Sequence, residues 1–176
     1  KTMSMLMDAL MNNSDSVLTE GIPLLTSLIE ISFDIMSLSQ NYSNDDEEDV
    51  NSLPAPLRVI MQRLDQFVIL LSDPPNLAPL SLSFGTLNPP LGETRLKVVE
   101  FLSALYHIGF APIERELIKH NILSVIFDLF FKYEFNNILH NIVLKNVSFI
   151  LAGESLELKK ALFKDCRIVE RIIEAN

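Results

Sequence analysis

Few side chains in this sequence have the types and spacing that chemistry requires. Cys166, His140 and the asparagines Asn136 and Asn137 are the nominal parts of a cysteine hydrolase, which uses a thiolate, a base and an orienting amide. No recognisable nucleophile motif surrounds Cys166, and a lone cysteine in a helical protein is more often a small buried apolar side chain. We therefore predict that this chain is not an enzyme.

Metal and cofactor sites are not predicted either. The histidines His107, His120 and His140 belong to no H-E-x-x-H motif, and no carboxylate stands at metal-ligand spacing from them. The glycines of "FGTLNPPLG" form neither G-x-G-x-x-G nor G-x-x-x-x-G-K, the two common phosphate-binding patterns. We expect no metal and no cofactor.

Composition indicates a helical protein with much apolar surface to cover. Apolar residues make up 48% of the 176, and only 5 residues are glycine, which is sparse for the turns of a many-stranded fold. Residues 1–92 hold 3 basic and 12 acidic side chains, while the remainder holds 11 of each, so the chain has no basic stripe for nucleic acid. The acidic run at 44–50 is either a solvated loop or a docking site for a basic partner.

The cysteine count bears on the compartment. A single cysteine excludes an internal disulfide framework and suits a reducing environment, so we expect a cytoplasmic protein, with the nucleus as an alternative location. A membrane-spanning helix needs about 18 apolar residues, and no such run is present. The longest charge-free run, 74–92, contains five prolines. We therefore expect no contact with a membrane.

Apolar residues recur at helical spacing along most of the chain. The first half is expected to form helices over 1–11, 19–39 and 54–73. The apolar side of the second helix is predicted to carry Leu24, Leu25, Leu28, Ile31, Ile35 and Leu38. Two stretches break the pattern, the acidic segment 41–52 and the proline-rich segment 73–92, and we expect both to be irregular loops.

From residue 93 the expected helices follow a cycle of one long, one short and one medium helix. The first cycle covers 93–108, 112–120 and 122–133, and the second covers 136–152, 155–165 and 167–175. The two starts differ by about 43 residues, which is the period of armadillo and HEAT repeats. We predict an all-α, armadillo/HEAT-like right-handed helical-repeat solenoid that forms a single domain over 1–176, in which each repeat covers apolar surface of the next.

Polar residues at the start of the second cycle have two interpretations. Asn136 or Asn137 is placed to cap the helix that follows, because its side chain can accept a hydrogen bond from a backbone N–H, which contributes about 1 kcal/mol. Within that helix, His140 and Asn146 fall inside the apolar arc, where a polar group needs a hydrogen-bond partner. That partner is either the neighbouring repeat or, if these positions line a surface groove, another protein.

Three segments of the chain resemble one protein family. The segment "FGTLNPPLGETRLKVVEFLSAL" carries the pattern P-P-x-G-x-x-R-L at Pro89, Pro90, Gly92, Arg95 and Leu96. The segment "VIFDLFFKYEFNNILHNIV" carries F-F-K-Y-x-x-N-N-x-L-H, and "LKKALFKDCRIVERIIEA" follows in the same order. Together they resemble the SAPS-domain proteins, the phosphatase-associated regulatory subunits of protein phosphatase 6 and its fungal equivalent.

The resemblance implies a function. The protein would be a non-catalytic scaffold that binds a protein phosphatase 6-type catalytic subunit and helps to direct it to substrates, with ankyrin-repeat regulatory proteins as further partners. The chain would be a fragment of a longer SAPS-type domain. Periodicity alone supports only a generic armadillo- or HEAT-type adaptor, which is the alternative function.

We expect a partner-binding patch where the helix starts of neighbouring repeats meet, because equivalent helix starts lie on the same edge of a solenoid. This patch would comprise Gly92, Arg95, Asn136, Asn137 and His140. Arg95 can form bidentate, charge-assisted bonds to a carboxylate of the partner. The alternative is that Arg95 ties the 73–92 loop to the helices.

Overall fold

The computed structural model of the chain describes residues 2–12, 15–38, 50–73, 78–82 and 85–175. Most of these residues are helical, which confirms the all-α prediction. The helices are α1 (Thr2–Met11), α2 (Asp15–Leu38), α3 (Ala55–Met61), α4 (Leu64–Ser72), α5 (Gly92–His107), α6 (Ala111–Lys119), α7 (Ile122–Lys132), α8 (Asn137–Ala152), α9 (Leu156–Lys160) and α10 (Ile168–Glu174). A 3₁₀ turn spans Val50–Ser52, and a π-helical turn at Ala161–Asp165 continues α9. An antiparallel hairpin joins β1 (Leu80–Leu82) to β2 (Gly85–Leu87).

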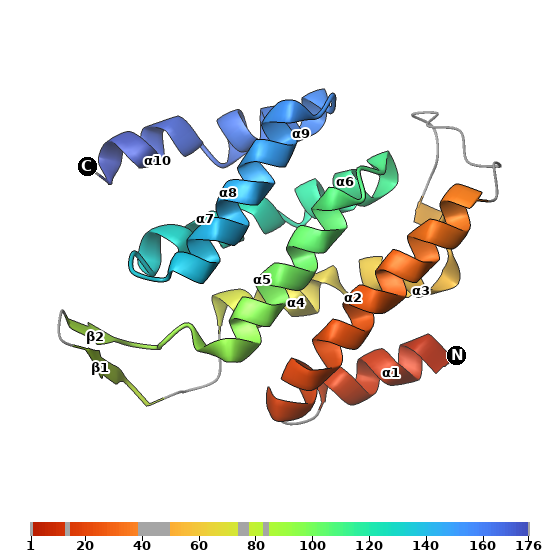
Figure 1. Cartoon of the computed structure of the whole chain (residues 1–176), viewed down its shortest axis with the longest axis horizontal. Coiled ribbons are helices and arrows are strands. Elements are labelled where there is room, and N and C mark those ends of the chain that lie inside the picture. Colours follow the sequence, from red (N-terminus) through yellow and green to blue (C-terminus); the bar gives the residue numbers. More distant parts are fainter. Residues whose placement is uncertain (1, 13–14, 39–49, 74–77, 83–84, 176) are drawn as a thin grey trace.

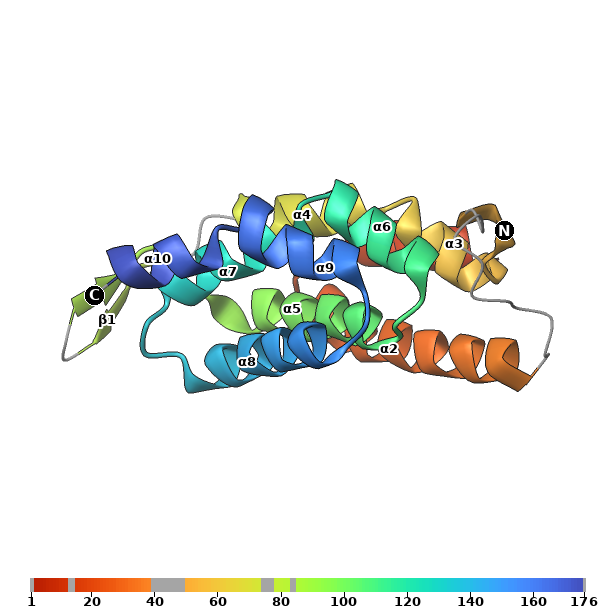
Figure 2. The same ribbon diagram turned by 90° about the horizontal axis from the view of Figure 1, so that it is seen from above.

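The helices are arranged in two layers. Figure 1 shows α2, α5 and α8 running in the same diagonal direction, and Figure 2 shows these three in one layer, with α3, α4, α6, α7 and α9 in the other. Helix α5 packs against α2 on one side and α8 on the other. Because it is covered on several sides, it buries a large set of apolar residues: Val98, Val99, Phe101, Leu102, Leu105 and Tyr106.

Two successive three-helix units follow residue 91. The first has the predicted order of long, short and medium. In the second, α9 and the π-helical turn together span 156–165 and are longer than α10, so the predicted order of the last two helices is wrong there. Helix α5 contacts α8 and α6 contacts α9, so the first and second helices of the two units lie beside their equivalents. Helix α7 contacts the π-helical turn and is joined to α10 by the bond from Arg171 to Asp128. The third helix of each unit is preceded by a non-glycine residue in left-handed geometry. These residues are Asn121, with φ 53°, before α7 and Arg167, with φ 50°, before α10.

Helix α2 contains a segment, Ser16–Ile35, that is long and apolar enough to cross a membrane by length and composition. In this structure one side of the segment packs against α5 and α3, and 39% of the segment is buried. Its buried side presents residues at helical spacing, all at most 3% exposed: Leu18, Ile22, Leu25 and Ile29.

The predicted apolar side of α2 was largely wrong. Leu25 is buried, but Leu24, Ile31 and Ile35 are 59%, 55% and 63% exposed. Helix α2 is apolar on more than one side, so spacing alone fits two faces, and the position of α5 decides which face is buried.

The single helix predicted over 54–73 is two helices, α3 and α4. The chain leaves helical geometry at Arg63, which has φ −121° and ψ 12° and whose guanidinium lies 2.6 Å from the carboxylate of Asp8 in α1. The buried apolar positions continue at helical spacing through this break, at Leu57, Ile60, Leu64 and Phe67. The pattern therefore gave no sign of the break, which depends on packing against α1.

The two predicted irregular loops also need correction. The 73–92 segment contains the β1–β2 hairpin, in which Leu80 pairs with Leu87 and Leu82 with Gly85. The alternation in "LSLSFGTL" is a strand signal, but the surrounding prolines dominated the prediction. In the acidic 41–52 segment, residues 50–52 form the 3₁₀ turn, and 41–49 lie outside the described residues.

Candidate functional site

A pocket of about 620 Å³ lies between the hairpin, the start of α5 and the junction of α7 with α8. The hairpin contributes Leu80 and all three residues of β2, the next stretch contributes residues 90–92, and the junction contributes residues 132–138. We call this the junction pocket. Three of its lining side chains are large, apolar and exposed, namely Phe135 at 65%, Ile138 at 58% and Leu80 at 47%.

Three of the five predicted site residues, Gly92, Asn136 and Asn137, line the junction pocket. They come from the starts of α5 and α8, so the structure brings together two motifs that are far apart in the sequence. Arg95 and His140 are not among the lining residues.

Arg95 lies beneath the pocket and is only 4% exposed. Its Nε donates to the carbonyl of Leu91 at 2.8 Å, its Nη1 to that of Leu71 at 3.3 Å, and its Nη2 to that of Pro90 at 2.6 Å. Nη2 also donates to the hydroxyl of Tyr133 at 2.7 Å. The guanidinium thus joins the end of α4 and the proline-rich segment to the end of α7.

Tyr133 completes this network. Its hydroxyl donates to the carbonyl of Pro89 at 2.7 Å, and the Arg95 guanidinium carbon lies 5.4 Å from the ring centroid. Tyr133 also lines the junction pocket, so it forms the contact between the buried arginine and the pocket. This geometry matches the alternative in which Arg95 ties the 73–92 segment to the helices.

The start of α8 is fixed by its own side chains. Oδ1 of Asn136 accepts from the backbone N–H of Leu139 at 3.0 Å, which confirms the predicted N-cap. Nε2 of His140 lies 3.2 Å from the carbonyl of Phe130, and the two rings are 4.3 Å apart. His140 is therefore packed against α7, while Asn137 remains exposed at the pocket.

Gly92 begins α5 with φ +74°, in the left-handed region. A Cβ is disfavoured in that conformation, so the sharp entry into α5 calls for glycine. The residue is exposed and lines the pocket, so its backbone is accessible from outside.

The amide nitrogen of Asn146 has a hydrogen-bond partner in the neighbouring unit, whereas its buried Oδ1 has none among the described residues. Asn146 is fully buried, and its Nδ2 donates to Oγ of Ser103 in α5 at 2.8 Å. Of the two interpretations given above, the geometry agrees with a bond to the neighbouring helical unit rather than to another protein.

The candidate catalytic residue Cys166 has the environment of a structural cysteine. It is 4% exposed, and burial raises the pKa of its thiol to about 11, with the nearby Asp165 carboxylate adding to the effect. A nucleophilic cysteine needs the opposite, a lowered pKa and access to substrate. Within the described ranges, no group of three or more His, Cys, Asp and Glu side chains could hold a metal ion.

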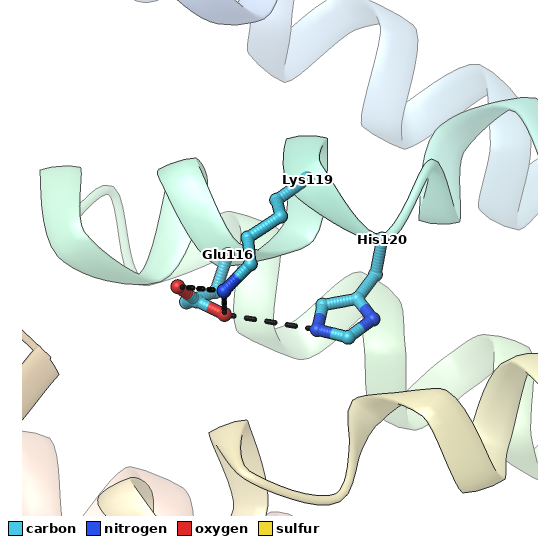
Figure 3. A network of polar contacts seen from close by, with 3 residues as sticks. All are labelled: Glu116, Lys119 and His120. Carbon is cyan, nitrogen blue, oxygen red and sulfur yellow. Dashed lines mark hydrogen bonds and ion pairs between the residues drawn. The ribbon is translucent and has the colours of Figure 1, made fainter.

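A polar network on α6 is the remaining cluster that contains a histidine and a carboxylate (Figure 3). The ammonium of Lys119 lies 3.0 Å from both carboxylate oxygens of Glu116, and Nε2 of His120 lies 3.7 Å from one of them. Lys119 and His120 lie three and four positions after Glu116, at the C-terminal end of α6, and no nucleophile takes part in these contacts. We interpret this network as support for the end of α6.

Sequence reasoning missed the roles of Tyr133 and of the hairpin. Tyr133 stands inside the F-F-K-Y motif, but the motif does not reveal that its hydroxyl reaches Arg95. The hairpin was visible as alternation between leucine and a polar residue from Leu80 onward, followed by Gly85.

Comparison with known proteins gives a consistent result. The sequence profile of the SAPS family, described as SIT4 phosphatase-associated protein, matches residues 1–176. Regulatory subunit 3 of serine/threonine-protein phosphatase 6 from Gallus gallus is 38% identical over 135 residues, which cover 68% of this chain and 16% of the relative. Regulatory subunit 1 from Mus musculus is 35% identical over 182 residues, which cover 90% of this chain and 21% of the relative.

A third relative, regulatory subunit 2 from Homo sapiens, is 32% identical over 130 residues, or 73% of this chain and 14% of its own length. The chain thus spans about a fifth or less of the length of these curated relatives. No solved structure matches it significantly. Since the family profile covers every residue, including both motifs at the junction pocket, the chain belongs to the SAPS family of SIT4 phosphatase-associated proteins.

Proposed function

We propose that this chain is part of a non-catalytic regulatory subunit that binds a protein phosphatase 6-type Ser/Thr phosphatase catalytic subunit and helps to direct it to substrates. The observation that carries the proposal is membership of the SAPS family over 1–176, together with relatives named as regulatory subunits of that phosphatase. The buried Cys166, whose pKa is raised by burial, supports the non-catalytic part.

The proposal includes a shape, an armadillo/HEAT-like right-handed solenoid. Two hydrogen bonds between the three-helix units support it, because each joins residues 43 positions apart. They are Asn146 to Ser103, between α8 and α5, and Arg171 to Asp128, between α10 and α7. A constant offset is expected where each repeat stacks on the equivalent face of the one before. An extended stack of this kind holds a large partner without ordering many loops, which lowers the entropy cost of association.

The proposed contact with the phosphatase is the patch of Gly92, Arg95, Asn136, Asn137 and His140. Its accessible part is the junction pocket, where Gly92, Asn136 and Asn137 lie beside the exposed Phe135. Arg95 and His140 would act from below, by holding the pocket walls in place through Tyr133 and Phe130. Ankyrin-repeat proteins as further partners, and a cytoplasmic or nuclear location, remain part of the proposal on the family resemblance.

The experiment is a binding measurement on the protein at its natural length. Purified catalytic subunits of protein phosphatase 6 and of a different Ser/Thr phosphatase class are immobilised in parallel. We expect saturable binding to the first and none to the second. Binding to neither would remove the phosphatase assignment and leave a generic helical adaptor, and equal binding to both would remove the stated specificity.

A further inference from the structure

The β1–β2 hairpin has an edge that faces the junction pocket. Only two residues separate the strands, so Leu82 and Gly85 form the closing hydrogen-bonded pair of the antiparallel register. Hydrogen-bonded and non-hydrogen-bonded pairs alternate, so the next pair, Ser81 and Thr86, has its N–H and C=O groups directed away from the partner strand. The backbone of Thr86 therefore presents one donor and one acceptor on the outer edge of β2.

This outer edge is on the pocket side. All three residues of β2 line the junction pocket, against only Leu80 of β1. Figure 1 shows β2 on the side of the hairpin that is nearer to the junction of α7 and α8. The wall across the pocket from β2 contains the exposed Phe135 and Ile138, which offer apolar contact opposite a polar backbone edge.

Nothing on the strand itself blocks further pairing. Proteins usually protect an exposed edge with lysine, proline or an inward-pointing charge. The residues of β2, Gly85, Thr86 and Leu87, include none of these, and the first proline after them is Pro89. The strand is only three residues long, which limits any added strand to a short segment.

We propose that the junction pocket binds a short extended peptide segment of a partner protein, which adds as a third strand to the outer edge of β2. Main-chain hydrogen bonds to Thr86 would hold the segment, and its alternate apolar side chains would enter the pocket against Phe135 and Ile138. An extended backbone is the occupant that the outward-directed donor and acceptor of Thr86 select, because the backbone groups along the side of a helix are already paired within the helix. The inference deepens the proposed function and rests on it for the identity of the partner, but the peptide chemistry is tested independently.

The probe is a library of fluorescent heptapeptides in which the second, fourth and sixth residues are leucine, isoleucine, valine or phenylalanine and the others are threonine. The full chain is titrated into the library, and polarisation is measured. We expect saturable binding by part of the library. N-methylation of the threonines at the third and fifth positions of a binding peptide, which removes two N–H groups and leaves the side chains, should weaken binding about tenfold.

The protein variants form a matched pair. Thr86→Pro removes the N–H on the outer edge of β2, and Ser81→Pro removes the equivalent N–H on the far edge of the same hairpin. We expect Thr86→Pro to weaken peptide binding about tenfold and Ser81→Pro to leave it unchanged, provided that both variants keep the melting temperature of the parent chain. The N-methylated peptide gives the same answer on the unaltered chain if a proline variant does not fold.

Three results would overturn the inference. One is a library that binds no better than a matched library with proline at the centre. Another is binding that N-methylation does not weaken. The last is a concentration-dependent dimer in sedimentation velocity that Thr86→Pro abolishes, since the edge would then pair with a second copy. If the chain binds peptides but the natural-length protein does not bind the phosphatase subunit, the proposed function is rejected and this inference stands. If the phosphatase subunit binds but the peptides do not, this inference is rejected and the proposed function stands.

Discussion

Arg95 shows how one residue can look like a binding residue in the sequence and serve the fold in the structure. Among the described residues, its acceptors are carbonyl oxygens and a phenol, with no carboxylate within ion-pair distance. A buried guanidinium needs nearly all of its donors satisfied, because an unsatisfied charged group in the interior is costly. The motif identified the right residue, but only the path of the proline-rich segment shows what it holds.

We predict that Arg95→Ala lowers the free energy of unfolding by about 3 kcal/mol, because several buried acceptors lose a charged donor at once. Urea denaturation of the chain measures this loss. Tyr133→Phe is the matched smaller change, since it removes one hydroxyl of the same network and should cost about 1 kcal/mol. Unchanged stability of Arg95→Ala, together with lost affinity for the catalytic subunit, would instead assign Arg95 to the contact.

His107 gives a prediction on pH. His107 is on the exposed side of α5, and its partial burial lowers its pKa below 6.5, with the ammonium of Lys145 lowering it further. The unfolded chain therefore binds a proton at His107 more readily than the folded chain does. The contribution of His107 to stability is present above pH 6.5 and is lost as the pH falls through the lowered pKa of the folded state. NMR titration of the ring should give a folded pKa below 6.5.

Lys145→Gln is the control for this titration. It should move the pKa of His107 part of the way back, because burial is the larger cause and remains. The ring of His107 packs on Phe149 at a centroid distance of 4.9 Å, and that contact is unaffected by the change at Lys145. A pKa at or above 6.5 in the unaltered chain would contradict the prediction.

At the scale of helices and strands, the sequence predicted where the helices lie better than it predicted which side of each helix is buried. The helices after residue 91 were predicted well because their apolar spacing is regular and they end at clear signals such as Asn121, although the second unit does not keep the long, short and medium order. The break at Arg63 and the buried side of α2 were missed because both depend on neighbours that periodicity does not contain. The candidate site was found in part, because motif residues near helix starts indicated the pocket, whereas its β-strand wall was obscured by prolines.

The packing of α5 on α8 leads to a prediction at this scale. Ser103 and Asn146 form a buried pair at 2.8 Å, and each should tolerate loss of its partner poorly. We expect Asn146→Ala to cost about 2 kcal/mol and the pair to show a coupling energy of about 1 kcal/mol in a double-mutant cycle with Ser103→Ala. Additive effects of the two changes would mean that the contact does not stabilise the interface.

At the scale of the whole molecule, Cys166 is buried where the π-helical turn leads into α10. We predict that Cys166→Ser leaves binding to any protein partner intact and lowers stability by only about 1 kcal/mol, because a small polar oxygen replaces a buried apolar sulfur. Calorimetry measures the change in stability, and the binding assay on the natural-length protein measures whether partner binding is kept. A hydrolytic activity that disappears on this replacement would contradict the non-catalytic proposal.

The Arg95 network also bears on the order in which the chain can fold during synthesis. The guanidinium belongs to α5, but the hydroxyl that completes its set of acceptors is 38 residues further along, on Tyr133. When α5 has left the ribosome but Tyr133 has not, Arg95 still lacks its last hydrogen-bond acceptor. The proline-rich segment therefore becomes fully anchored only after α7 has emerged and docked, so the pocket that it borders is among the last features of this region to mature.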